Sequence, residues 1–236
     1  VRIGGITIGG DNPVAVQSMT NTSTMDTQES IAQIGRIREA GCRIVRLTAP
    51  GRREGENLRN IAEGITSEGY TDVAVVADIH FTPEVAMMAA NYVDKVRINP
   101  GNYKDDDGQF AELLEKCRSR NVALRIGVNH GSLAQHIVEK WGDTPQGMVE
   151  SAMEFLYKCR EKQFDQVVVS MKSSNVRVMI HAYRLLASRL AEENMPYPLH
   201  LGVTEAGDGA EGRIKSAVGI GALLADGIGD TIRVSL

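Results

Sequence analysis

The sequence has few cysteines and few aromatic residues, and it has no long uninterrupted hydrophobic segment. Its 236 residues include three cysteines and 5% aromatic residues, and no C-x-x-C pair occurs. This pattern excludes a disulfide-rich scaffold and favours a reducing compartment. No apolar run reaches the roughly 18 residues of a membrane span, and the N-terminal residues resemble neither a signal nor a transit peptide. We therefore expect a soluble, cytoplasmic protein that does not bind membranes.

An excess of positive charge is also missing. Lys and Arg number 26 against 30 Asp and Glu, which gives a formal net charge of −4. A general attraction to nucleic acid is therefore excluded, and an anionic ligand must be bound by a local cluster of cations. With 42% hydrophobic and 24% charged residues, the composition is that of an ordinary globular domain rather than a disordered chain.

Short β-branched segments alternate with longer helical patterns along the whole chain, which is typical of βα units around a parallel sheet. Eight strands are predicted, at residues 15–18, 43–48, 73–78, 95–99, 123–129, 166–171, 199–204 and 231–235. Before them, Gly4-Gly5 between two β-branched segments predicts a hairpin that covers one end of a barrel. The fold class is thus an α/β protein, a (β/α)8 TIM barrel with an N-terminal β-hairpin, and residues 1–236 form one domain.

Helix signals fill the intervals between the strands. Asp26 with Glu29 resembles a capping box, and Pro83 suits the first turn of a helix. Only seven connecting helices are predicted, because the chain ends on the eighth strand. The chain also begins at Val1 without a methionine. We therefore expect a processed or excised part of a longer protein, whose closing helix either is missing or belongs to sequence beyond Leu236.

Polar side chains recur at alternating positions where the predicted strands end, as in Arg97-Ile98-Asn99. Side chains two residues apart share one face of a strand, and the aliphatic face of a barrel strand packs against the helices. The polar face should therefore point into the barrel, where its C-terminal mouth holds the active site of such enzymes. Five cations are expected to meet there: Arg46, Arg97, Arg125, Lys172 and Arg233.

Five like charges are costly to bury together unless an anion neutralises them. One Arg can bind two phosphate oxygens at once, and it stays charged. Four Arg and one Lys therefore predict a diphosphate or two phosphates as the ligand. The glycine-rich segment 205–212 follows the seventh predicted strand and opens a helix. That position often holds phosphate in barrels, although a glycine-rich loop by itself is more often only a turn.

Three titratable residues are candidates for acid–base chemistry: Asp78, His80 and Glu205, all at predicted strand ends. Each could instead hold an arginine in place. The other four histidines lack a metal-ligand spacing and are expected in surface, cap or core positions: His130, His136, His181 and His200. Cys42, Cys117 and Cys159 are expected to pack as small apolar residues, so no metal site is predicted in this chain.

Seven segments resemble the 4-hydroxy-3-methylbut-2-enyl diphosphate synthases of the methylerythritol phosphate pathway of isoprenoid biosynthesis. They span nearly the whole chain: residues 14–20, 45–48, 77–81, 96–102, 125–133, 201–207 and 227–235. Residues 142–151 and 197–202 are similar to the three-domain form of this family, found in plastids and some bacteria. The resemblance implies a barrel that binds 2-C-methyl-D-erythritol 2,4-cyclodiphosphate.

Carried onto this sequence, the resemblance implies two groups of site residues. The diphosphate would be held by Arg46, Arg97, Arg125, Lys172, Arg233 and Ser235. The carbon skeleton would be oriented, and protons transferred, by Asp78, His80, Asn99, Asn129 and Glu205. These positions agree with those that the strand pattern selects without the resemblance.

The family is also implied to need a [4Fe-4S] cluster, held by three Cys and one Glu of a C-terminal domain and reduced by ferredoxin or flavodoxin. None of those ligands is in this chain, and an inserted domain is implied to be missing as well. The parent protein is therefore expected to be an oxidoreductase, in the cytoplasm or in the plastid stroma of a plant. This chain alone should not turn over, and homodimer formation stays open.

Three alternatives compete with this interpretation. Lys172 at the end of the sixth predicted strand could form a Schiff base, as in a class I aldolase. A pterin-binding barrel of the dihydropteroate synthase type would have a similar architecture and a diphosphate leaving group. The chain could also be an anion-binding module with no activity.

Overall fold

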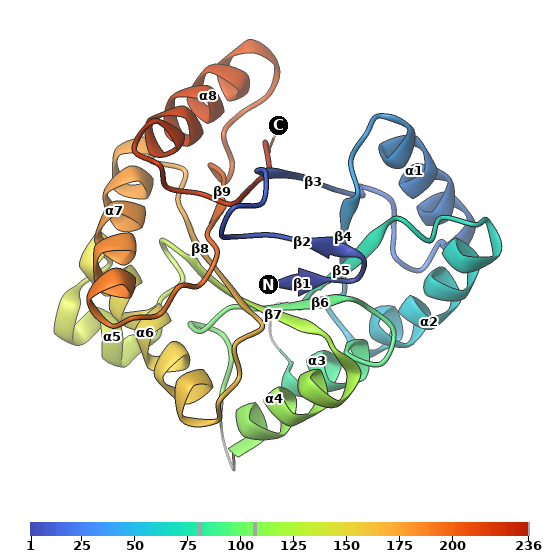
Figure 1. Ribbon diagram of the computed structural model, residues 1–236, viewed down its shortest axis with the longest axis horizontal. Helices are drawn as coiled ribbons and strands as arrows, with labels where there is room; N and C mark the ends of the chain where they lie inside the picture. Colours follow the sequence, from blue (N-terminus) through green and yellow to red (C-terminus); the bar gives the residue numbers. More distant parts are fainter. Residues whose placement is uncertain (80–81, 106–107, 236) are drawn as a thin grey trace.

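The computed structural model describes residues 1–79, 82–105 and 108–235. Eight parallel strands form a barrel, and the helices surround it as an outer ring (Figure 1). The strands are β3 (Ala15–Met19), β4 (Ile44–Thr48), β5 (Ala74–Asp78), β6 (Lys95–Ile98), β7 (Ala123–Asn129), β8 (Val167–Lys172), β9 (His200–Leu201) and β10 (Thr231–Ile232). The helices are α1 (Thr27–Glu39), α2 (Arg52–Ser67), α3 (Pro83–Ala89), α4 (Gln109–Arg120), α5 (Gln135–Trp141), α6 (Pro145–Glu161), α7 (Val176–Glu192) and α8 (Gly209–Ala225). The predicted (β/α)8 barrel is confirmed.

Hydrogen bonding runs around the barrel in the order β8-β7-β6-β5-β4-β3-β10-β9. A single parallel bridge, between Val169 and Leu199, joins β8 to β9. Along each strand the aliphatic residues of one parity, such as Val45 and Leu47, pack in the core beneath the helices. The other parity therefore points into the barrel, as the alternation of side chains requires.

The predicted N-terminal hairpin is present as β1 (Arg2–Ile3) and β2 (Ile6–Thr7), joined through Gly4 at φ 56°. It lies across the centre of the barrel (Figure 1). Ile3 and Ile8 are fully buried in a separate cluster that closes the N-terminal end of the barrel interior. The barrel residues of this cluster are Ile44, Ala74, Val76, Ala123 and Val168. Below the polar mouth, the interior therefore has an apolar floor.

The predicted seventh and eighth strands are too long. Strand pairing ends after Leu201 in β9 and after Ile232 in β10, rather than continuing to residues 204 and 235. Gly202 lies so close to Lys172 Nζ and the Arg233 carbonyl that a Cβ there would be 2.4 and 2.5 Å from them. Only isolated bonds, such as Arg233 N to the Leu201 carbonyl at 3.1 Å, continue past the strand ends.

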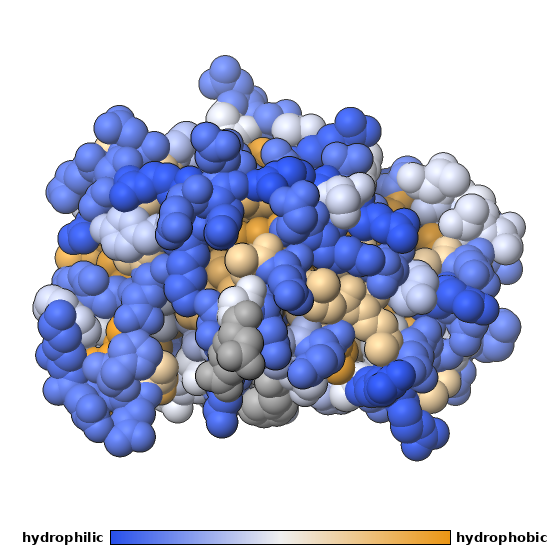
Figure 2. Space-filling view, turned by 90° about the horizontal axis from the view of Figure 1, so that it is seen from below, coloured by the Kyte–Doolittle hydropathy of each residue, from blue (hydrophilic) through white to orange (hydrophobic). Residues whose placement is uncertain are grey.

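The described residues contain eight helices rather than seven, since α5 precedes α6 in the connection between β7 and β8. Asp26 caps α1, because its side chain accepts a bond from Glu29 N at 3.0 Å, but the reciprocal bond of a capping box is not formed, since Asp26 N donates to the Ser23 carbonyl at 2.9 Å. Pro83 begins α3, as predicted. Val16 of β3 and Val234 after β10 are 56% and 46% exposed, so no described helix covers these outward positions. The side of the molecule in Figure 2 is mainly hydrophilic, with apolar residues largely recessed between polar ones.

Candidate anion-binding site in the barrel mouth

The structure brings the five predicted cations together inside the C-terminal half of the barrel. Four of them are buried, with exposed fractions of 8% for Arg46, 3% for Arg97, 1% for Arg125 and 6% for Lys172. Arg233 is half-buried. Strand alternation places them, because each lies on the inward parity of its strand or just beyond the end of that strand.

Asp78 at the end of β5 sits between two of these arginines. Its Oδ1 is 3.0 Å from Nη1 of Arg97, and its Oδ2 is 3.3 Å from Nε of Arg46. Among the described residues, Asp78 is the one carboxylate in the buried set, which also contains the fully buried Lys95. The interior of the barrel therefore carries a surplus of positive charge that its own side chains do not neutralise.

Burial and mutual repulsion both act on these cations. The pKa of Lys172 lies well below its usual 10.5, first because the ammonium is desolvated and then because Arg125 and Arg46 repel it. The same two causes, burial and then Arg46, lower the pKa of Arg233 to about 10. Each lowered pKa means that burial and repulsion disfavour the charged form of the side chain, and a bound anion would offset both effects.

Two glycines provide the space in which these side chains lie. A Cβ at Gly127 of β7 would be 2.5 Å from Nε of Arg97 and 3.3 Å from both Nε and Nη2 of Arg125. A Cβ at Gly202 would be 2.4 Å from Nζ of Lys172. Any larger residue would displace a cation, so the sequence reserves both positions for close approach.

Several N–H groups at this place have no hydrogen-bond partner among the described residues. Nε of Arg97 and Nε of Arg125 are both buried and unpartnered, although Nη2 of Arg97 donates to the Gly127 carbonyl at 3.0 Å. Buried donors without acceptors are rare in folded proteins and each needs an explanation. An anion seated beside Gly127 would accept from both.

The remaining predicted site residues, at the outer rim of the mouth, differ in their surroundings. Nδ2 of Asn99 donates to Ser132 Oγ at 3.0 Å, and the amide oxygen of Asn129, oriented toward Arg97, accepts from Nη2 at 3.2 Å. Ser235 Oγ accepts from Arg233 Nη2 at 3.4 Å. Glu205 is exposed with φ 49°, and its side chain forms no ion pair or hydrogen bond within the described part of the chain. His80 lies outside the described residues.

A second polar layer lies deeper in the barrel, and the sequence reasoning missed it. Lys95 and His200 are both 0% exposed, Lys95 Nζ is 3.4 Å from Gln17 Oε1, and Gln17 Nε2 donates to Thr231 Oγ1 at 2.8 Å. His200 Nδ1 lies 2.8 Å from Nη1 of Arg125. The signal was available, because Lys95 and His200 stand two residues before Arg97 and Gly202 on the same strand face.

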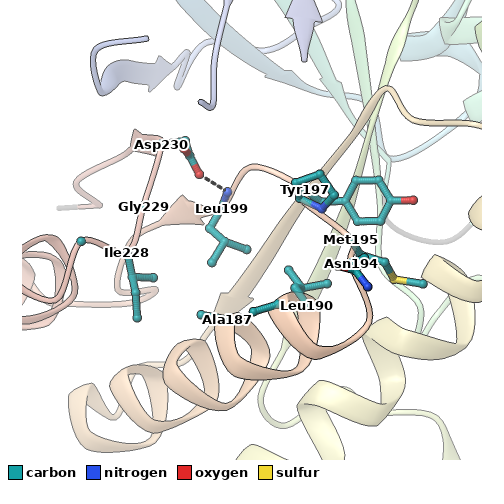
Figure 3. Close-up of a pocket in the computed structure, with 12 residues that line it drawn as sticks. Ala187, Leu190, Asn194, Met195, Tyr197, Leu199, Ile228, Gly229 and Asp230 are labelled. Atoms are coloured by element: carbon teal, nitrogen blue, oxygen red, sulfur yellow. Dashed lines mark hydrogen bonds between the residues drawn. The ribbon is translucent and has the colours of Figure 1, made fainter. Parts of the chain in front are cut away.

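A cavity of about 520 Å³ lies at the opposite end of the barrel, between α7 and the segment before β10 (Figure 3). Leu190, Leu199 and Ile228 line it, and Leu199 N donates to Asp230 Oδ2 at 2.7 Å. The residues before β9 and β10 belong to the N-terminal strand ends. This cavity is therefore separate from the cationic mouth.

The three cysteines are buried and free, as expected of small core residues. Burial raises the pKa of Cys117 on α4 and of Cys159 on α6 to about 12, so neither is poised as a thiolate. Over residues 1–79, 82–105 and 108–235, no group of three or more His, Cys, Asp or Glu side chains converges as metal ligands would. The same residues include no helix long and apolar enough to cross a membrane.

Comparison with known proteins shows which sequences this chain resembles. The model of the GcpE TIM-barrel domain matches residues 1–236. A 4-hydroxy-3-methylbut-2-en-1-yl diphosphate synthase (flavodoxin) of Phocaeicola vulgatus is 54% identical over 257 aligned residues, which cover 100% of this chain and 42% of that protein. The enzyme of the same name from Leptospira interrogans is 51% identical and is covered to 38%. The chain thus spans about two fifths of the length of these relatives.

Solved structures with much lower identity share the architecture. Dihydropteroate synthase from Thermus thermophilus has a TM-score of 0.61 and 16% identity, with 94% of this chain and 88% of that chain covered. Phospho-2-dehydro-3-deoxyheptonate aldolase from Thermotoga maritima has a TM-score of 0.64 and 15% identity, with 99% and 62% covered. At such identities the likeness shows the barrel fold alone. The family match over every residue and the identities above 50% show more: this chain belongs to the GcpE TIM-barrel family.

Proposed function

We propose that this chain is the substrate-binding barrel of a 4-hydroxy-3-methylbut-2-enyl diphosphate synthase and that it holds 2-C-methyl-D-erythritol 2,4-cyclodiphosphate in its mouth. The observation that carries the proposal is the surplus of buried positive charge around Gly127. Among the described residues, Asp78 is the one buried carboxylate, against four buried mouth cations, and the Nε groups of Arg97 and Arg125 have no hydrogen-bond partner there. A cyclic diphosphate supplies the negative oxygens that this arrangement lacks.

The residues of the mouth have distinct parts in the proposal. The diphosphate oxygens accept hydrogen bonds from Arg46, Arg97, Arg125, Lys172, Arg233 and Ser235. Asp78 keeps Arg46 and Arg97 oriented, since it forms an ion pair with each guanidinium group. Asn99 and Asn129 contact the carbon skeleton from the rim. Glu205 and His80 are the proposed proton donors.

The overall reaction takes up two electrons, opens the cyclic diphosphate and releases a hydroxyl as water. The described residues of this chain do not fit the [4Fe-4S] cluster that would deliver those electrons, because Cys42, Cys117 and Cys159 are buried in separate elements. We place the cluster in a C-terminal domain of the longer protein, with an inserted domain before it. Flavodoxin, named in the relatives, is the proposed donor, ferredoxin the alternative, and a cytoplasmic homodimer the proposed assembly.

The competing enzyme classes lose support. Relatives at 54% identity carry the synthase name, whereas the dihydropteroate synthase and aldolase structures share only the fold. The low pKa of Lys172 would suit a Schiff base, so borohydride trapping with a keto substrate is a direct test. A covalent adduct at Lys172 would contradict the synthase.

Calorimetry of this chain with the cyclodiphosphate tests the proposal. We expect binding that weakens as salt is raised, because the attraction to the open mouth is screened. Arg97→Ala should weaken binding by about 2 to 5 kcal/mol, the range for truncating one partner of a buried charge pair. Arg59→Ala is the matched control, because Arg59 is 60% exposed on α2 and pairs with Glu63. If neither Arg97→Ala nor added salt weakened binding, the cyclodiphosphate would bind at another site.

A further inference from the structure

One contact inside the barrel links strands that are not neighbours in the sheet. Arg125 of β7 and His200 of β9 are separated by β8, and their side chains meet with Nη1 2.8 Å from Nδ1. Both are buried, with 1% and 0% exposure. A guanidinium has only donors, so Nδ1 of His200 must accept this bond. His200 is therefore a neutral imidazole that carries its proton on Nε2.

The charges around His200 maintain that neutral form. The residues that act on it are all cationic and come from four strands: Lys172 of β8, Arg125 of β7, Lys95 of β6 and Arg46 of β4. Burial first, and then these charges, hold the pKa of His200 well below its usual 6.5. Tyr183 of α7, which donates to the backbone of His200, contributes a neutral hydroxyl because its own pKa is raised by burial. Burial and these charges thus favour the neutral imidazole, in which Nδ1 can accept the bond from Arg125.

The backbone of His200 is fixed from the outer layer of the fold. The Tyr183 hydroxyl donates to the carbonyl of His200, and Tyr183 is itself 0% exposed on α7. On the other side, His200 pairs with Thr231 of β10. The ring therefore projects from an anchored position toward Arg125, and it is not free to follow the guanidinium if that group moves.

The contact determines which edge of Arg125 points toward the mouth. With Nη1 bound to His200, the opposite edge, formed by Nε and Nη2, lies beside Gly127, two residues nearer the end of β7. Nε of Arg125 is buried without a partner among the described residues. Two parallel N–H groups on one edge are the arrangement with which Arg binds a phosphate bidentately.

We propose that His200 is a positioning residue that fixes the guanidinium plane of Arg125, so that its Nε/Nη2 edge is presented to the anion beside Gly127. This proposal rests on the proposed function, since it requires an anion in the mouth. His200 itself does not touch the ligand. Its effect on binding must therefore pass through Arg125, which makes the proposal testable by a double-mutant cycle.

The cycle compares His200→Leu, Arg125→Met and the double variant, with inorganic pyrophosphate and the cyclodiphosphate as probes. We expect His200→Leu to weaken binding about tenfold or more in the parent and to have almost no further effect on Arg125→Met. His200→Asn should retain most of the affinity, because its amide oxygen replaces Nδ1 as the acceptor. His181→Leu, which changes an exposed histidine of α7, is the control. An equal loss in both backgrounds would show a merely structural role and overturn the proposal.

A second measurement needs no variant. In ¹⁵N-histidine NMR spectra of the unaltered protein, His200 should give the neutral form protonated at Nε2, and it should still be neutral at pH 6.5, where an ordinary histidine is half protonated. A proton on Nδ1, or an imidazolium at neutral pH, would overturn the proposal even if the variants failed to fold. If the unaltered protein bound neither anion, the proposed function would fail. If the unaltered protein and the His200→Leu variant bound pyrophosphate and the cyclodiphosphate equally tightly, only the proposed role of His200 would fail.

Discussion

Replacing Asp78 by Asn tests the balance of charge in the mouth. The substitution keeps the shape of the side chain but removes the negative charge that lies 3.0 Å from Arg97 and 3.3 Å from Arg46. Breaking a buried pair by removing one partner costs about 3 to 5 kcal/mol, because the remaining charge is left uncompensated. A domain of this size loses about 2 to 4 °C in Tm for each kcal/mol, so the expected decrease is about 6 to 20 °C.

The surface provides a closely matched control. Asp72 also pairs with two arginines, Arg38 at 2.6 Å and Arg43 at 2.9 Å, but its side chain is 40% exposed. Water and salt screen such a pair, so Asp72→Asn should change Tm far less than Asp78→Asn does. Thermal unfolding followed by circular dichroism, with both variants and the parent in the same buffer, makes the comparison.

Adding pyrophosphate distinguishes a charge effect from a packing effect. An anion that binds the folded state stabilises it by mass action, and in the variant it also compensates the charges of Arg46 and Arg97 that Asp78 no longer neutralises. Asp78→Asn should therefore recover much of its lost Tm as pyrophosphate is raised. Equal decreases for the two aspartate variants, or a loss at Asp78 that pyrophosphate leaves unchanged, would refute the reasoning.

Two further predictions concern buried positions. Lys95 has a folded-state pKa well below the 10.5 of the unfolded chain, so between those values the unfolded state binds more protons and stability rises with pH. Lys95→Met should therefore raise the urea midpoint of unfolding most at low pH, with a gain that shrinks toward pH 10.5; a gain that grows with pH would contradict this. Gly127→Ala should weaken pyrophosphate binding about tenfold or more, because its Cβ would lie 2.5 Å from Arg97 Nε. Gly221→Ala on α8, with open space around the new Cβ, should leave binding unchanged in the same titration.

Much of the barrel and its cluster of cations could be predicted because both follow from local periodicity. Strand alternation alone places Arg97 and Arg125 inside, whichever strands are their neighbours. The ends of β9 and β10 could not be predicted, because strand pairing depends on partners that are distant in the sequence, as where His200 and Leu201 pair with Thr231 and Ile232. α5 was missed because it is short and its preceding residue, Ala134, gives no capping signal.

The partners within the site were predictable only in part. That Asp78 could hold an arginine was one of two expected roles, and its two ion pairs confirm that it does so. That His200 would contact Arg125 was not foreseen, since this contact crosses the barrel between residues 75 positions apart. Periodicity gives the face on which a residue lies, whereas its partner depends on the curvature of the whole sheet.

Because the N-terminal hairpin closes one end of the barrel with apolar side chains, the electric field of the buried cations extends into solvent mainly through the mouth. Ile3 and Ile8 cover the inner charges from below with low-dielectric material, so the field of the cations is directed outward through the mouth. Such focusing increases the rate at which an anion arrives, but an anion that dissociates must leave through the same opening and against the same potential. The barrel by itself therefore cannot speed the capture of an anion without slowing its release.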